Sequence, residues 1–124
     1  MNNNEITFIT KSISGQEDKL MVANSLFEPD HLNGECIGYE FGCIGYLIRP
    51  VEINGKELIG VILFSEDEES YSTVSSGVSN IVCNWADIGF EPSRENPVMV
   101  KYEQVRKGTH TYYTIKLVKK KKGE

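Results

Sequence analysis

Residues 97–118 read PVMVKYEQVRKGTHTYYTIKLV, and this stretch decides the fold that the sequence predicts. Two segments in it alternate apolar with polar side chains, the apolar sets being Val98, Val100 and Tyr102, then Tyr113, Ile115 and Leu117. A period of two sends alternate side chains to opposite faces of a strand. The turn Arg106-Lys107-Gly108-Thr109 joins the segments, so they predict a β-hairpin with one apolar face. Because an isolated hairpin is only marginally stable in water, the rest of the chain must supply a core for that face.

The opposite face of this hairpin is expected to be cationic and aromatic. Lys101, Tyr112 and Lys116 share it by the same alternation. The turn adds Arg106, Lys107 and His110.

The segment 35–49 is apolar at nearly every other residue, and its frame shifts by one between Phe41 and Ile44. A β-bulge produces such a shift, so we expect one long bent strand or two short strands that meet at a corner. Asn54-Gly55 is the preferred pair for a two-residue hairpin turn. The apolar run that follows, within 56–64, is typical of a central strand buried on both faces.

A helix is predicted over 70–87. Ser65 is followed three residues later by Glu68, a pattern that often starts a helix. Apolar residues then recur at steps of three and four, forming one stripe: Tyr71, Val74, Val78, Ile81, Val82 and Trp85. Gly89 supplies the stop.

The order of these elements predicts a mainly β protein with one helix, built as a five-stranded Greek-key barrel of the oligonucleotide-binding (OB) type. Helix 70–87 then lies between the third and fourth strands. The third strand could come from 6–10, from 19–24 or from a division of 35–49. The alternative is an α+β sheet with one covering helix. Residues 1–118 are expected to form a single domain, and 119–124 a basic flexible tail.

Length and composition are those of an ordinary globular domain. The chain has 124 residues, of which 40% are hydrophobic and 25% charged. The apolar run Leu58–Phe64 is far shorter than the roughly 20 residues that cross a bilayer. The start of the chain lacks the features of a secretory signal, so a cytoplasmic location is expected, with no membrane partner.

Three cysteines are expected to be reduced core residues. They are Cys36, Cys43 and Cys83. Their spacing is unlike that of zinc ligands, and the chain has two histidines, so neither a metal nor a cofactor is predicted.

Charge is distributed unevenly around a net value of −5. Five acids and no base lie between Glu57 and Glu69, whereas bases far outnumber the single acid, Glu103, between Val98 and Lys122. A locally basic region on an acidic protein is expected of a face that contacts phosphates. For Lys119–Lys122 alone, a solubilising tail is the alternative interpretation.

Single-stranded DNA binding without sequence preference requires cations for the phosphates and aromatic faces for the bases. The hairpin offers both, and the bent strand could add Arg49 with either Tyr39 or Tyr46, depending on which tyrosine faces outward. Trp85 ends the helical stripe and is expected in the core. The predicted nucleic-acid-binding residues are Lys101, Tyr112, Lys116, Arg106, Lys107, Arg49, Tyr39 and Tyr46.

Four stretches of the chain are informative together: the strand end and acidic turn Ile62–Tyr71, the helix Ser72–Trp85, and the hairpin segments Val98–Tyr102 and Thr111–Leu117. They resemble the small single-stranded DNA-binding proteins of Bacillus phages that replicate with a protein primer. Leu32–Ile37 is similar to the L-x-G-x-x-I strand entry of that family. The resemblance implies an OB-like fold and a role in phage DNA replication or recombination in the host cytoplasm. Single-stranded DNA and replication proteins would be its partners.

The sequence also bears on two other classes of function. No nucleophile elbow, phosphate-binding glycine loop, zinc-protease motif or dinucleotide fingerprint occurs, so an enzyme is not expected. A small protein-interaction module, for example an inhibitor of a host factor that binds no nucleic acid, is the alternative function. An unpaired strand edge could also pair with a second copy of the chain to give a homo-oligomer.

Overall fold

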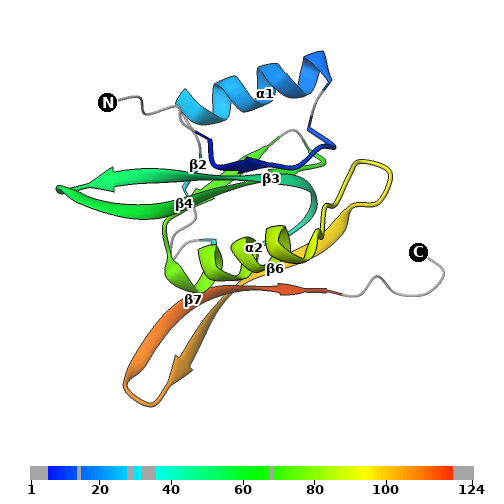
Figure 1. Cartoon of the computed structure of the whole chain (residues 1–124). Helices are drawn as coiled ribbons and strands as arrows, with labels where there is room; N and C mark the ends of the chain where they lie inside the picture. The colour runs from blue at the N-terminus through cyan, green and yellow to red at the C-terminus, as the bar shows by residue number, and fades with distance from the viewer. Residues whose placement is uncertain (1–5, 14, 28–29, 32–35, 68, 119–124) are drawn as a thin grey trace.

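The computed structural model describes residues 6–13, 15–27, 30–31, 36–67 and 69–118 (Figure 1). Within them the chain forms β1 (Phe8–Ile9), α1 (Gln16–Phe27), β2 (Asp30–His31), β3 (Glu40–Ile53), β4 (Lys56–Ser65), β5 (Ser70–Thr73), α2 (Ser76–Ile88), β6 (Val98–Lys107) and β7 (His110–Leu117). The predicted tail 119–124 lies outside the described residues. In the described part of the chain, no helix is long and apolar enough to cross a membrane.

The strands form one sheet in the order β2-β5-β4-β3-β6-β7, and β1 pairs with β3 outside that path. All paired neighbours are antiparallel except β2 and β5. The end strands β2 and β7 do not pair with each other in the described residues, so the sheet is open. The predicted five-stranded barrel is therefore not closed in the described residues, and a mainly β, α+β fold describes the chain.

Strand β3 connects the two halves of this sheet. Its first residues, Glu40–Cys43, pair with β6, whereas Gly45–Ile53 pair with β4. The register shifts between Cys43 and Gly45, which confirms the bulge predicted from the change of apolar frame. Asn54 and Gly55 both have positive φ values, of 53° and 77°, as the predicted turn between β3 and β4 requires.

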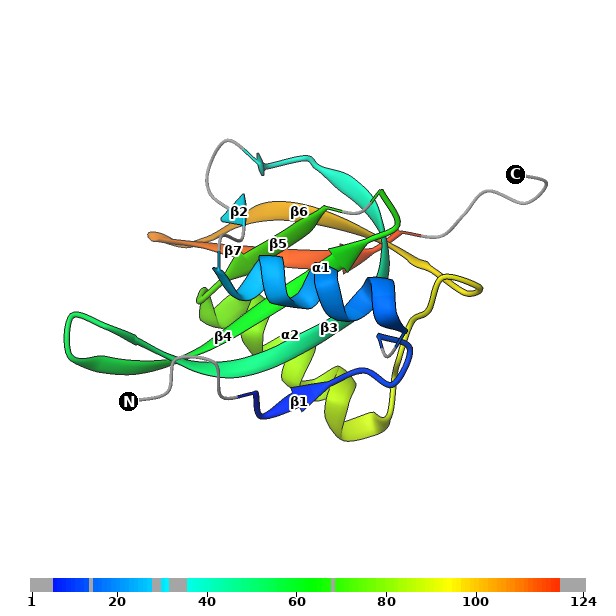
Figure 2. The same cartoon turned by 90° about the horizontal axis from the view of Figure 1, so that it is seen from above.

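Apolar side chains pack on both sides of the bent sheet. Helix α1 covers one side of β3 and β4 (Figures 1 and 2), where Met21 and Val22 meet Leu47 and Ile62. Helix α2 lies between the β3–β4 half and the β6–β7 half (Figure 1). The larger cluster there is formed by Cys36, Phe41, Cys43, Tyr46, Ile48, Val61, Leu63, Val78, Val82, Trp85, Val100, Tyr102 and Ile115.

The helix between the third and fourth predicted strands begins later than expected. Ser70–Thr73 form strand β5, which pairs with β4, and α2 starts at Ser76. The Ser65 hydroxyl accepts a hydrogen bond from the Asp67 N–H (3.2 Å), and the Ser65 N–H donates to the Glu69 carbonyl (2.8 Å). Ser65 therefore closes a tight turn between two strands instead of capping a helix. The inward stripe of Val78, Val82 and Trp85 and the stop at Gly89 are as predicted.

A second helix, α1, occupies 16–27, a range that includes 19–24, one of the candidates for the third strand. Its apolar stripe is weak, so periodicity does not reveal it. The prediction of one helix is accordingly wrong.

Two β-ribbons project from the body of the molecule (Figure 1). We call residues 49–60 the β3–β4 ribbon and residues 98–117 the β6–β7 hairpin. Over Arg49–Ile53, the described part of the chain pairs β3 with β4 alone. At the far end of the other ribbon, Lys107 pairs with His110 around Gly108, whose φ is 64°.

Candidate nucleic-acid interface

One face of the β6–β7 hairpin carries lysines and a tyrosine ring. Lys101 lies directly opposite Lys116, Val105 opposite Tyr112, and Lys107 opposite His110. Directly opposed residues in an antiparallel pair project to the same side, and so do residues two apart on one strand. These side chains therefore share one face, whereas Arg106 projects to the other.

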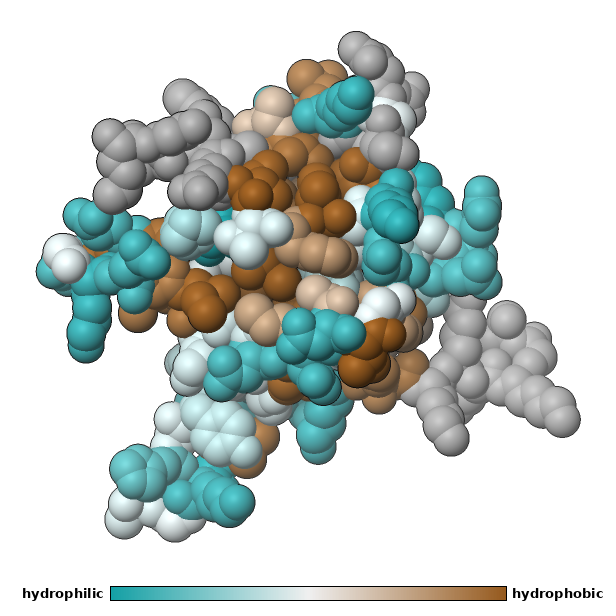
Figure 3. Space-filling view, in the orientation of Figure 1, coloured by the Kyte–Doolittle hydropathy of each residue, from teal (hydrophilic) through white to brown (hydrophobic). Residues whose placement is uncertain are grey.

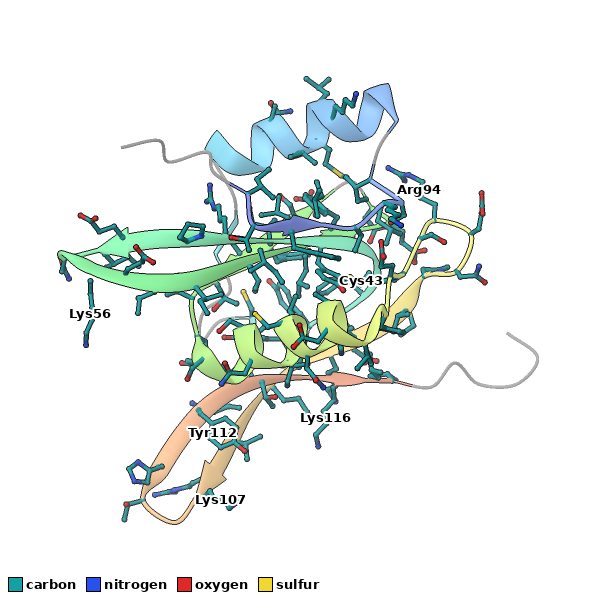
Figure 4. All side chains as sticks on the ribbon, viewed as in Figure 1. Cys43, Lys56, Arg94, Lys107, Tyr112 and Lys116 are labelled. Atoms are coloured by element: carbon teal, nitrogen blue, oxygen red, sulfur yellow. The ribbon has the colours of Figure 1, made fainter. Side chains whose placement is uncertain are left out.

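The tyrosine and the cations nearest the hairpin tip are open to solvent. Tyr112 is 42% exposed, and Arg106, Lys107 and His110 are exposed as well. Figure 4 shows Lys107, Tyr112 and Lys116 spread along the hairpin from its tip toward its base. At about 3.4 Å per residue, Tyr112 lies about 7 Å from His110 and about 14 Å from Lys116 along the strand.

Glu103 partly neutralises the base of this face. Its Oε1 lies 3.1 Å from Lys116 Nζ, and its Oε2 lies 4.0 Å from Lys101 Nζ. Glu40 of β3 is also placed directly opposite Lys101. Two lysines at the base thus face two carboxylates, and the net positive charge of the hairpin is concentrated at its tip. Glu103 is two residues from Lys101, so the period of two places it on the same face, a neutralisation that the predicted cationic face does not include.

The first turn of α2 supports the strand that carries Tyr112. A Cβ added at Gly77 would overlap the Tyr113 carbonyl oxygen and lie 3.2 Å from Tyr112 Cδ2. The helix backbone therefore packs directly on β7 beside the tyrosine ring. Contact this close is open only to glycine.

Tyr46 belongs to the core and not to the interface. It is fully buried, and its hydroxyl donates a 2.6 Å hydrogen bond to the Phe90 carbonyl. Its ring packs against Phe8 and Trp85, with centroids 5.7 Å away in each case. Burial raises the pKa of the Tyr46 hydroxyl to about 12. Trp85 lies in the core, as expected.

Tyr39 is the tyrosine of this region that faces outward. It is 48% exposed, and its carbonyl accepts a 2.9 Å hydrogen bond from the Tyr102 N–H of β6. Its backbone is thus held against the hairpin, and its ring is available beside it. Tyr39 precedes β3, whereas Tyr46 lies past the bulge and shares the inward face of Phe41 and Ile48.

Arg49 is not brought to the hairpin. It lies past the bulge, opposite Gly60, and shares a face with Leu47, which packs under α1. The β6–β7 half of the sheet lies on the other side of α2 (Figure 1). Burial lowers the pKa of Arg49, which is half-buried and forms no ion pair within the described residues. Its predicted place beside Lys101 is wrong because β3 bends at the bulge.

No group of three or more His, Cys, Asp or Glu side chains in the described part of the chain could hold a metal ion. The hairpin offers positive nitrogens and a phenol ring, which are groups for noncovalent recognition of an anionic, aromatic ligand.

Comparison of the chain with protein-family models, with curated proteins and with solved structures gave no significant match. The resemblance to phage single-stranded DNA-binding proteins therefore remains a prediction from the sequence.

Proposed function

We propose that the protein binds single-stranded DNA without sequence preference, with the β6–β7 hairpin as the contact surface. The observation that carries the proposal is the exposed Tyr112 ring between the cationic tip and the lysines at the base, all on one projecting face. Base stacking on such a ring contributes about 1–3 kcal/mol per base and tolerates any sequence. A role in phage DNA replication or recombination is part of the proposal and rests on the family resemblance.

The tip contributes more to phosphate binding than the base does in this proposal. Lys107 has no carboxylate opposite it in the hairpin register, whereas Lys101 and Lys116 share Glu103; Arg106 adds a charge at the same tip from the other face. Tyr39 supplies a second ring next to β6. Because the whole chain carries a net charge of −5, only a local cationic surface can attract a polyanion.

Replacement of Tyr112 by alanine should weaken binding of a fluorescein-labelled thirty-nucleotide oligo(dT) by about 1–3 kcal/mol, because one stacking contact is lost. Tyr112→Phe keeps the ring and should keep the affinity, which makes it the matched control. Fluorescence anisotropy at several salt concentrations measures both, and the wild-type affinity should fall steeply with salt as counterions are released.

Single-stranded RNA and duplex DNA of the same length test the substrate class. The proposal expects the duplex to bind more weakly than oligo(dT), since paired bases cannot stack on Tyr112. If wild-type protein binds no oligo(dT) at low salt, the DNA-binding proposal fails, and the protein-interaction module becomes the better interpretation.

A further inference from the structure

An open groove separates α2 from the β3–β4 ribbon, on the opposite side of α2 from the β6–β7 hairpin. It has a volume of about 490 Å³, which is in the range of about 300–1,000 Å³ that ligand sites occupy. Its lining is largely apolar and includes Phe8, Ile48, Ile59 and Ala86, and Arg49 is the one base among the described residues that line it. Ile59 is 50% exposed, and Figure 3 shows apolar surface between the ribbon and α2.

Two carboxylates flank this apolar lining from opposite walls. Glu57 comes from β4 and Asp87 from α2, and both side chains are exposed. Neither forms an ion pair or a hydrogen bond within the described part of the chain. Cys83 lies one helical turn before Asp87 and also lines the groove. Burial, and then the Asp87 carboxylate, raise the pKa of the Cys83 thiol.

We propose that this groove binds a basic amphipathic peptide segment of a partner protein. Apolar side chains of the segment lie on the floor, and its Lys or Arg residues face Glu57 and Asp87. A purely apolar ligand would desolvate the two carboxylates without compensation. With two carboxylates and one guanidinium, that of Arg49, the lining is net negative, which disfavours nucleic acid and anionic membrane surfaces. The net charge of −5 favours approach of a basic partner.

The probe for this site is a fluorescein-labelled eighteen-residue peptide of leucine and lysine in helical order, titrated with the full chain. Saturable one-to-one binding is expected, and the same peptide with glutamate in place of lysine should not bind. The double variant Glu57→Gln/Asp87→Asn should lower the affinity roughly tenfold, as expected from the loss of two ion pairs. The matched control Asp67→Asn/Glu95→Gln removes two exposed carboxylates elsewhere and should leave the affinity unchanged.

Two further readouts locate the probe. Ile59→Ser should weaken binding, whereas Leu20→Ser, a change of an exposed leucine on α1, should not. Bound peptide should slow alkylation of Cys83 by iodoacetamide in the folded protein, in which Cys36 and Cys43 are buried. If Ile59→Ser fails to fold, the affinity of Glu57→Gln/Asp87→Asn and the alkylation rate of Cys83 still test whether the peptide binds in the groove.

Three results would overturn the proposal. The first is that the leucine–lysine peptide does not bind. The second is that Glu57→Gln/Asp87→Asn and the control Asp67→Asn/Glu95→Gln lose the same affinity, because the peptide would then be attracted only by the overall charge. The third is self-association that Glu57→Gln/Asp87→Asn abolishes in sedimentation experiments, since the occupant would then be a second copy. Tyr112→Ala should leave peptide binding intact, so this test is separate from that of DNA binding.

Discussion

Glu103 is the residue that sets the charge of the hairpin face. It lies between the two lysines of adjacent strands, at 3.1 Å from one ammonium and 4.0 Å from the other. Both lysines are partly exposed and Glu103 is half-buried, and ion pairs at a protein surface contribute about 0–1 kcal/mol to folding. Their larger effect is on binding, because a polyanion must displace the carboxylate or accept its repulsion.

Replacement of Glu103 by glutamine should therefore strengthen oligo(dT) binding. With the carboxylate gone, Lys101 and Lys116 can both neutralise phosphates, and the slope of log affinity against log salt should become steeper by roughly one unit. Anisotropy titrations across a salt series measure this slope. Glu52→Gln, which removes an exposed carboxylate of the β3–β4 ribbon, is the control and should change neither quantity. Weaker binding of Glu103→Gln would show that this face is not the DNA contact.

The element that positions the interface is α2, through its backbone contact with β7. Gly77 lies inside the helix, where alanine is ordinarily the better residue by about 1 kcal/mol. Here the added methyl group would meet the Tyr113 carbonyl oxygen, so the helix or the strand must shift. Packing across elements therefore opposes helix propensity at this position.

Gly77→Ala should lower the free energy of unfolding by about 1–3 kcal/mol, as overpacking of a tight contact does. Asn80→Ala, at an exposed position of the same helix, should instead leave stability unchanged or raise it by up to about 0.7 kcal/mol. Urea unfolding followed by circular dichroism measures both. A gain in stability for Gly77→Ala would mean that α2 does not press on β7.

Hairpin, bulge and ribbon turn are elements that the sequence predicts correctly, because each depends on neighbours in the chain. The period of two in 98–105, the frame shift between Phe41 and Ile44, and the Asn54-Gly55 pair all act within a few residues. Strand β5 is not predicted, because it does not depend on neighbours in the chain alone. Tyr71 fits a helical stripe, yet Leu63 is its strand partner, and that pairing is made across the sheet.

At the scale of the whole molecule, two buried phenols and a buried thiol make the stability of the fold depend on pH in the alkaline range. Burial raises the pKa of Tyr46, Tyr102 and Cys43 to about 12, from ordinary values of 10 for the phenols and 9 for the thiol. Between about pH 9 and 12 the unfolded chain therefore holds fewer protons than the folded chain. Stability should be independent of these groups below that window and fall as pH rises through it.

Two tyrosine variants test this linkage. Tyr46→Phe and Tyr102→Phe should each make the alkaline fall in unfolding free energy shallower than in wild type. At pH 7, Tyr46→Phe should cost about 1 kcal/mol because the hydrogen bond to Phe90 is lost. The Tyr102 hydroxyl is buried without a hydrogen-bond partner in the described residues, so Tyr102→Phe should not lower the free energy of unfolding at pH 7. Urea unfolding from pH 7 to 11 measures the fall, and an unchanged slope in both variants would contradict the linkage.

The sequence by itself determined the local structure and the candidate cationic face of the hairpin, because a two-residue period places Lys101, Tyr112 and Lys116 on one side whatever surrounds them. Tertiary structure decided which side chains reach that face. The bend of β3 at Cys43 and Gly45 carries Arg49 to the α1 side of the sheet and sends Tyr46 inward to Phe90 and Trp85. The open sheet and the groove beside α2 likewise depend on contacts between residues far apart in the chain. The spacing of apolar residues along the sequence does not predict such contacts.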